Sequence, residues 1–162
     1  MPRPPEDIEA RVSLYATHRD VVLEHRLGQG KDGIVFQTDV STAVKVFHRR
    51  ESYSRELACY QRFAHDQVEE IHGHAVPCLI AWDDELLVIE MEIVSPPYLI
   101  DFADCYLDAV PDFPDEVIEQ WHEEKREQFG DRWEEVQLML AFLRGQYGIH
   151  LLDVNPDNIR FV

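Results

Sequence analysis

Residues 28–35 read Gly-Gln-Gly-Lys-Asp-Gly-Ile-Val, and residues 43–45 read Ala-Val-Lys. The first stretch follows a G-x-G-x-x-G-x-V pattern, and the second ends in a lysine ten positions further on. Glycine lets a backbone approach a phosphate closely because it has no Cβ, and its N–H group can donate to phosphate oxygens. The pattern therefore predicts a β-hairpin that covers the phosphates of a nucleotide. The binding residues expected from it are Gly28, Gly30, Gly33, Val35, Ala43 and Lys45.

A second informative stretch lies near the other end of the chain, where residues 151–158 read Leu-Leu-Asp-Val-Asn-Pro-Asp-Asn. It contains a D-x-x-P-x-N pattern that places Asp153 five positions before Asn158. Because Asp, Asn and Pro are turn formers, this pattern alone would also describe a capped turn. This stretch resembles the catalytic loop of the protein-kinase-like superfamily, and residues 28–45 resemble its glycine-rich hairpin and lysine. The superfamily includes the smaller bacterial and aminoglycoside-type phosphotransferases. The resemblance extends from about residue 21 to residue 162.

This resemblance implies a site for ATP and Mg²⁺. Asp153 would accept or orient the proton of a substrate hydroxyl, and Asn158 would bind Mg²⁺. Lys45 would neutralise phosphate charge and would need a carboxylate partner to hold its charge and direction. Residues 55–60 are similar to the R-E-x-x-x-Y helix of small-molecule-type kinases, which makes Glu56 the expected partner and Glu51 its rival.

The strand that ends at residues 90–92 would form the hinge that recognises adenine. The resemblance assigns this role to Glu90, Met91 and Glu92, mainly through their backbone groups. The nucleotide is thus the expected ligand, and the acceptor of a phosphoryl group is left unnamed.

The sequence also departs from the superfamily. The D-F-G aspartate that holds the principal Mg²⁺ normally follows the catalytic loop, but only four residues follow Asn158. Residues 101–103 read Asp-Phe-Ala and look like a copy, although they precede the loop; Asp157, beside Asn158, is another possible substitute, and a partner chain is a third source. Leu151 and Leu152 stand where many protein kinases have His-Arg, so control by activation-loop phosphorylation is not expected.

Three functional hypotheses follow from these motifs and departures. The first is a phosphotransferase that moves the γ-phosphate of Mg-ATP to a hydroxyl of a Ser/Thr protein or a small molecule. The second is a pseudokinase that binds nucleotide or protein partners without transfer, which the missing metal aspartate favours. The third is an unrelated acidic α+β protein in which the motifs are coincidental.

Hydrophobic periodicity predicts the order of the elements. A leading helix is expected within residues 6–18 and a second over residues 51–63, where apolar residues recur at intervals of three and four. Strands are expected at residues 21–23, 34–36, 42–47, 76–80 and 86–89, with a turn at residues 83–85. Strand on both sides of the glycines excludes a dinucleotide-binding fold, which requires a helix after them. After residues 96–97, Pro-Pro, only helices are expected, at about 100–110, 115–129 and 132–146, with Asp131 capping the last.

The predicted fold class is therefore α+β. Residues 1–93 would form a kinase-like small lobe, with a five-stranded antiparallel sheet and one helix, and residues 94–162 a reduced all-helical large lobe that ends in the catalytic-type loop.

Charge and composition limit the partners. A net charge of −17 repels nucleic acid backbones and anionic lipid, and no apolar run reaches the ~20 residues of a membrane span.

Three widely spaced cysteines and an N-terminus without a signal-peptide core favour a cytoplasmic protein. His65, His72 and His74 form a loose cluster, but no cysteine or acidic pair lies at ligand spacing, so a metal site is not expected there. The apolar stripe of the last helix should pack under the catalytic-type loop; an uncovered far side would suit a homodimer.

Overall fold

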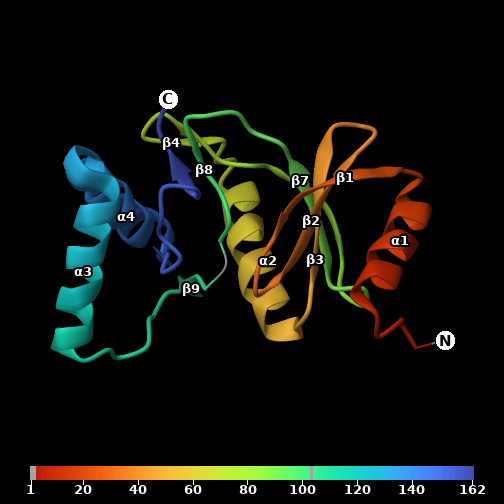
Figure 1. Cartoon of the computed structure of the whole chain (residues 1–162), viewed down its shortest axis with the longest axis horizontal. Helices are drawn as coiled ribbons and strands as arrows, with labels where there is room; N and C mark the ends of the chain where they lie inside the picture. Colours follow the sequence, from red (N-terminus) through yellow and green to blue (C-terminus); the bar gives the residue numbers. More distant parts are fainter. Residues whose placement is uncertain (1–2, 103) are drawn as a thin grey trace.

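The computed structural model describes residues 3–102 and 104–162, and its largest sheet has five antiparallel strands in the order β1-β2-β3-β7-β6. The first three strands form the expected meander, and Thr42 and Lys45 on the third pair with Glu92 and Ile89 on β7. Figure 1 shows this sheet at one end of the molecule and the C-terminal helices at the other. The bounds are β1 Leu23–Gln29, β2 Gly33–Thr38, β3 Thr42–Phe47, β6 Leu79–Asp83 and β7 Val88–Glu92.

Two helices cover the two faces of this sheet (Figure 1). Helix α1, Ile8–Arg19, begins at Asp7, whose carboxylate accepts a hydrogen bond from the backbone N–H of Ala10. Helix α2, Arg50–His65, turns a buried stripe of Tyr53, Glu56, Leu57, Tyr60 and Phe63 towards the opposite face. The three- and four-residue spacing of that stripe is the spacing of one helix face, as the sequence predicted.

The alternation of side chains along β3 and β7 decides what each face carries. Paired residues of antiparallel strands point to the same face, so Ala43 lies beside Met91 and Lys45 beside Ile89. Ala43, Ile89 and Met91 belong to the core that includes α2. Val44 belongs to the core beneath α1. The face that carries Lys45 is therefore the face of α2.

The second half of the chain combines helices with very short strands. Helices α3, Asp115–Phe129, and α4, Trp133–Tyr147, are joined by a 3-10 turn, η1, over Gly130–Arg132. One small sheet has the order β11-β8-β5-β4 and another pairs β10 with β9. Their bounds are β4 Glu70–Ile71, β5 His74–Ala75, β8 Tyr98–Leu99, β9 Tyr106–Leu107, β10 Ile149–His150 and β11 Ile159–Arg160.

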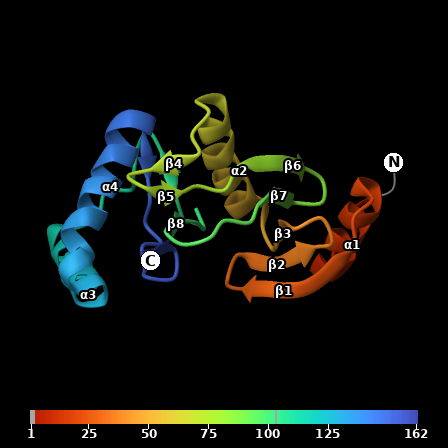
Figure 2. The same cartoon turned by 90° about the horizontal axis from the view of Figure 1, so that it is seen from above.

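The predicted fold class is confirmed in its main features, a five-stranded antiparallel sheet with α2 followed by a helical segment. Figure 2 shows α2 between the sheet and the pair α3 and α4. The stripe of α4 that was expected to pack inward is buried, at Val136, Met139, Leu140 and Leu143.

The helix predicted at residues 100–110 is wrong. Asp101, Asp104 and Asp108 have positive φ values of 62°, 55° and 68°, which a right-handed helix does not allow. Instead, β8 lies directly before this segment and β9 lies within it, and they pair with β11 and β10 from the last residues of the sequence. Ala103, which the prediction also included, lies outside the described residues.

Two smaller expectations also need correction. Asp131 does not cap α4, because the 3-10 turn precedes that helix and Arg132 occupies its N-cap position without a side-chain cap. The hairpin of β4 and β5, with His72 and Gly73 at positive φ between them, lies between the predicted helix at 51–63 and the predicted strand at 76–80, where the sequence predicted no element. Within the described ranges, no helix is both long enough and apolar enough to cross a membrane.

Candidate active site

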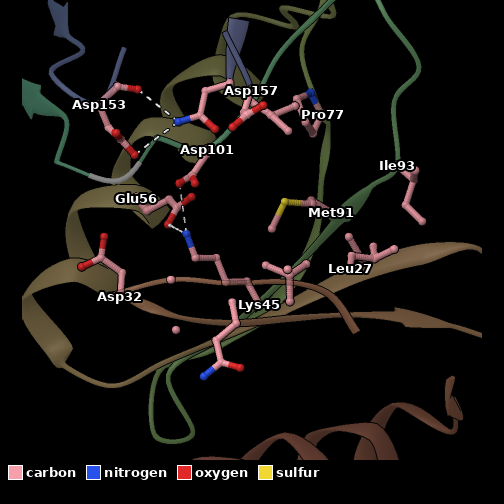
Figure 3. Close-up of a pocket in the computed structure, with 18 of the residues that line it drawn as sticks. Leu27, Asp32, Lys45, Glu56, Pro77, Met91, Ile93, Asp101, Asp153 and Asp157 are labelled. Atoms are coloured by element: carbon pink, nitrogen blue, oxygen red, sulfur yellow. Dashed lines mark hydrogen bonds and ion pairs between the residues drawn. The ribbon is translucent and has the colours of Figure 1, made fainter. Parts of the chain in front are cut away.

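A cavity of about 550 Å³ lies between the large sheet and the second half of the chain, within the range usual for small-molecule sites. All residues predicted for the site line this cavity, except Glu90. The predicted residues that line it are Gly28, Gly30, Gly33, Val35, Ala43, Lys45, Glu56, Met91, Glu92, Asp153, Asp157 and Asn158. The structure therefore brings together residues that are more than 100 positions apart in the sequence (Figure 3).

Lys45 and Glu56 form a buried ion pair at the centre of the cavity wall. The Nζ atom of Lys45 lies 2.8 Å from Oε2 of Glu56, and both side chains are almost fully buried. Burial lowers the pKa of Lys45, but the negative charges of Glu56 and Asp101 raise it more, so the ammonium group stays protonated. Burial also raises the pKa of Glu56, against the opposing effect of Lys45. Of the two candidate partners, the structure thus pairs Lys45 with Glu56, whereas Glu51 is exposed.

The three glycines of the hairpin are not equivalent in space. A Cβ atom on Gly33 would lie 2.0 Å from the backbone oxygen of Val46, so the close approach of β2 to β3 requires glycine there. A Cβ on Gly28 or Gly30 would meet no atom within 4 Å. Gly33 is therefore explained by packing within the protein, while Gly28 and Gly30 border open space in the cavity.

The catalytic-type loop is held by its own asparagines. The backbone N–H groups of Asp157 and Asn158 donate to the Asn155 side-chain oxygen, at 2.9 and 3.1 Å. The Asn158 amide donates to the backbone oxygen and to the carboxylate of Asp153, at 3.1 and 3.2 Å. These bonds fix the orientation of the Asp153 carboxylate towards the cavity (Figure 3).

Asp153 lies in a negatively charged environment. Burial and the charges of Asp101 and Asp104 raise its pKa, while Asn158 and Lys31 oppose this effect. A carboxylate whose pKa is raised by burial and like charges is a typical candidate for accepting a proton.

Asp101 lies beside the buried pair of Lys45 and Glu56. Its Oδ1 atom lies 3.2 Å from Nζ of Lys45 (Figure 3). The sequence offers residues 101–103 as a copy of the D-F-G motif before the loop, and the structure places Asp101 at the cavity. Further residues line the cavity with largely apolar side chains, and the motifs did not assign them to the site: Leu27, Tyr60, Pro77, Ile93, Val94 and Ile100.

Glu90 does not line the cavity. It pairs with Val44 on the α1 side of the sheet, and its carboxylate accepts hydrogen bonds from Tyr15, Arg19 and Thr42 at 2.8 to 2.9 Å. Its side chain therefore serves the packing of α1. Only its backbone remains available for the hinge role that the resemblance implied.

The three histidines His65, His72 and His74 do not form one group in the structure, because His65 lies on α2. His72 and His74 belong to the hairpin of β4 and β5, where their rings contact Phe142 and Phe161. In the part of the chain that the structure describes, no group of three or more His, Cys, Asp or Glu side chains is arranged to hold a metal ion. A metal ion in the cavity would therefore be held by fewer than three carboxylates, together with amide oxygens and oxygen atoms of a bound ligand.

No protein-family model and no curated protein matches this sequence. Among solved structures, the chain is similar to complexes of aminoglycoside phosphotransferases, which have the protein-kinase-like fold that the motifs resemble. The ternary complex of APH(2")-IIa with streptomycin and ATP matches with 18% identity over 76% of this chain and 37% of that chain, with a TM-score of 0.41. ADP-bound APH(2'')-Ib matches with 15% identity over 91% and 41%, with a TM-score of 0.46. The gentamicin complex of APH(2")-IIa matches with 15% identity over 90% and 40%, with a TM-score of 0.47. The chain thus spans about two fifths of the length of these structures.

Proposed function

We propose that this chain binds Mg-ATP in the cavity beneath the glycine-rich hairpin and acts as a kinase-like phosphotransferase. The observation that carries the proposal is the buried pair of Lys45 and Glu56, which faces Asp153 and Asn158 across a single cavity. A buried lysine directed by a carboxylate towards open space is suited to bind a polyanion.

Each wall of the cavity has a distinct task in this proposal. The hairpin backbone at Gly28 and Gly30 donates to phosphate oxygens, and Lys45 neutralises their charge. The backbone of residues 90–92 and the apolar walls hold the base. Asp153 takes the proton of an acceptor hydroxyl while the new O–P bond forms to the γ-phosphorus, the bond to the bridging oxygen breaks, and ADP leaves.

The side chains at the phosphate end of the cavity suit Mg²⁺, which prefers oxygen ligands and binds proteins through one or two carboxylates together with substrate phosphates. Asn158 and Asp157, the predicted metal ligands, and Asp153 all line this end. When bound, the cation would neutralise charge that develops on the phosphates.

The acceptor is a hydroxyl of a protein or a small molecule. The boundary between the two proposed lobes lies near residue 93. The three cysteines are free, which is compatible with the proposed cytoplasmic location. A pseudokinase that binds nucleotide without transfer is the alternative.

Thermal unfolding with ATP or ADP, each with and without Mg²⁺, tests nucleotide binding. A ligand at 100 times its dissociation constant adds about 2.7 kcal/mol, which corresponds to a rise of roughly 5–10 °C for a domain of this size. Lys45→Met should abolish the rise, because it removes the charge that holds the phosphates. The matched control is Lys125→Met on α3, which removes a lysine that does not line the cavity and should keep the rise.

A transfer assay with Asp153→Ala then separates the two functions. Transfer that the substitution removes would establish the phosphotransferase. Nucleotide binding without transfer would establish the pseudokinase, and transfer that survives would reject Asp153 as the catalytic residue. No thermal shift at saturating nucleotide would overturn the proposal as a whole.

A further inference from the structure

Asp101 occupies an unusual position in both the chain and the fold. It precedes the catalytic-type loop by about fifty residues, yet its carboxylate lies 3.2 Å from Lys45 and lines the cavity. Its φ of 62° is uncommon for a residue other than glycine. Residues held in such conformations cluster at functional sites, where the surrounding structure maintains them.

The segment that carries Asp101 is fixed to helix α2. The backbone N–H of Phe102 donates to Oε1 of Glu56 at 3.2 Å. The Phe102 ring is fully buried and packs against Tyr60 and Phe63, with ring centroids 5.1 and 5.2 Å apart. Asp101 therefore stands on a rigid support that it shares with the partner of Lys45.

The same segment is also fixed to the catalytic-type loop. Strand β8 pairs with β11 through Leu99 and Ile159, and the backbone N–H of Ile100 donates to the oxygen of Asn158 at 2.9 Å. This pairing places Asp101 beside Asn158 although they are far apart in the sequence. The Asn158 amide nitrogen is directed at Asp153, and both Asp101 and Asn158 line the cavity.

We propose that Asp101 supplies the acidic ligand for the divalent cation that accompanies the nucleotide, together with Asn158. This carboxylate would come from a segment before the loop, brought to the site by the pairing of β8 with β11. The inference rests on the proposed function, because the phosphates of the nucleotide complete the coordination. Mg²⁺ usually binds one or two carboxylates and substrate phosphates, so the site does not require three acidic side chains.

A rival role for Asp101 is to position Lys45, which it also contacts. The two roles differ in a measurable way. A metal ligand contributes to nucleotide affinity only when Mg²⁺ is present, whereas a group that positions Lys45 contributes equally with Mg²⁺ and in EDTA.

Isothermal titration calorimetry with the imido analogue of ATP, in saturating Mg²⁺ and in EDTA, tests the proposal. The wild-type chain should bind more tightly in Mg²⁺, and Asp101→Asn should remove this difference while retaining the affinity seen in EDTA. Asparagine keeps the shape of the side chain and tolerates positive φ, so the segment should keep its fold. Asp101→Gly, which also accepts positive φ, is the second variant.

Asp108→Asn is the matched control. It removes a carboxylate from the same segment, also at positive φ, but that carboxylate pairs with Arg62 outside the cavity, so the variant should keep the dependence on Mg²⁺. Asp157→Asn is a test of the rival metal ligand rather than a control, because Asp157 also lines the cavity.

The possible contrary results separate the inference from the proposed function. A Mg²⁺ effect that survives in both Asp101 variants, or is lost in Asp157→Asn alone, overturns the role of Asp101. Equal weakening with Mg²⁺ and in EDTA assigns Asp101 to Lys45 and also overturns it. Nucleotide binding by the wild-type chain that does not depend on Mg²⁺ overturns the inference but leaves the nucleotide site, and no binding at all overturns both.

Discussion

At the scale of single residues, the glycine-rich hairpin combines a structural glycine with two that the fold does not require. Gly33 lies against the backbone of Val46, whereas Gly28 and Gly30 border open space and have no positive φ. The sequence pattern treats all three alike. Their environments predict that substitution at the first affects stability and substitution at the other two affects ligand binding.

Gly33→Ala should destabilise the chain by about 1–3 kcal/mol, the usual range for forcing an extra methyl group into a packed site. Gly30→Ala, the matched control, should change the free energy of unfolding by less than about 0.5 kcal/mol. Urea denaturation of both variants measures the difference. Equal stability of the two variants would show that β2 and β3 do not approach as closely as this structure has them.

The same scale shows how far the sequence predicted the site. Motif residues such as Gly28, Lys45 and Asp153 could be recognised because phosphate chemistry demands particular residue types at particular spacing. Asp101 could not be placed in this way, since its position depends on the pairing of β8 with β11, two-residue strands without a periodic signal. The side chain of Glu90 faces away from the cavity because alternate strand residues face opposite sides, so the predicted hinge role would rest on its backbone alone.

At the scale of elements, helix α1 is held on the sheet by polar contacts across an otherwise apolar interface. Arg11 is buried and donates to the backbone oxygens of Leu86 and Phe47, each at 2.7 Å. Glu90 accepts hydrogen bonds from Tyr15 and Arg19 on the helix. A buried carboxylate with several donors is stabilising only while it is ionised and paired.

This arrangement predicts how stability depends on pH. Burial acts to raise the pKa of Glu90, but hydrogen bonds from Arg19, Tyr15 and Thr42 outweigh it and hold the pKa below its ordinary value. The unfolded chain therefore binds this proton more readily than the folded chain. The stabilising contribution is present above the unfolded pKa of about 4.3 and is lost as the pH falls towards the lower folded value.

Glu90→Gln should lower the melting temperature at neutral pH and weaken its decline between about pH 5 and pH 3, because the titrating group is gone. Thermal unfolding monitored by circular dichroism across this range provides the measurement. Glu24→Gln on the exposed strand β1 removes a carboxylate without touching α1 and controls for the change in charge. An unchanged slope in Glu90→Gln would mean that other carboxylates govern the acid transition.

Elements also show where prediction from sequence ends. The helices at Arg50–His65 and Asp115–Phe129 were found because their periodicity is local. The segment around residues 100–110 has helix-compatible spacing, yet it pairs with strands about fifty residues away, at Ile149–His150 and Ile159–Arg160. Long-range pairing of this kind overrides local preference and leaves no signal in a window of ten residues.

At the scale of the whole molecule, the second half of the chain leaves apolar side chains uncovered. On α3 and α4 these are Val117, Ile118, Leu138 and Phe142, and Leu138 is 65% exposed. The chain also carries a net charge of −17, so two copies repel one another at low ionic strength. Association of two copies through these apolar side chains of α3 and α4 would therefore be weak in dilute salt and stronger once the charge is screened.

We accordingly predict a homodimer whose formation increases with salt concentration, measured by sedimentation velocity over a range of protein concentrations. Leu138→Glu should keep the chain monomeric at every salt concentration, because it places a charge in the apolar contact. Val22→Glu is the matched control, since Val22 is 62% exposed just before β1 at the other end of the molecule (Figure 1). It adds the same charge and should leave the association intact. A wild-type chain that stays monomeric in high salt, or equal loss of association in both variants, would show that this face does not pair with a second copy.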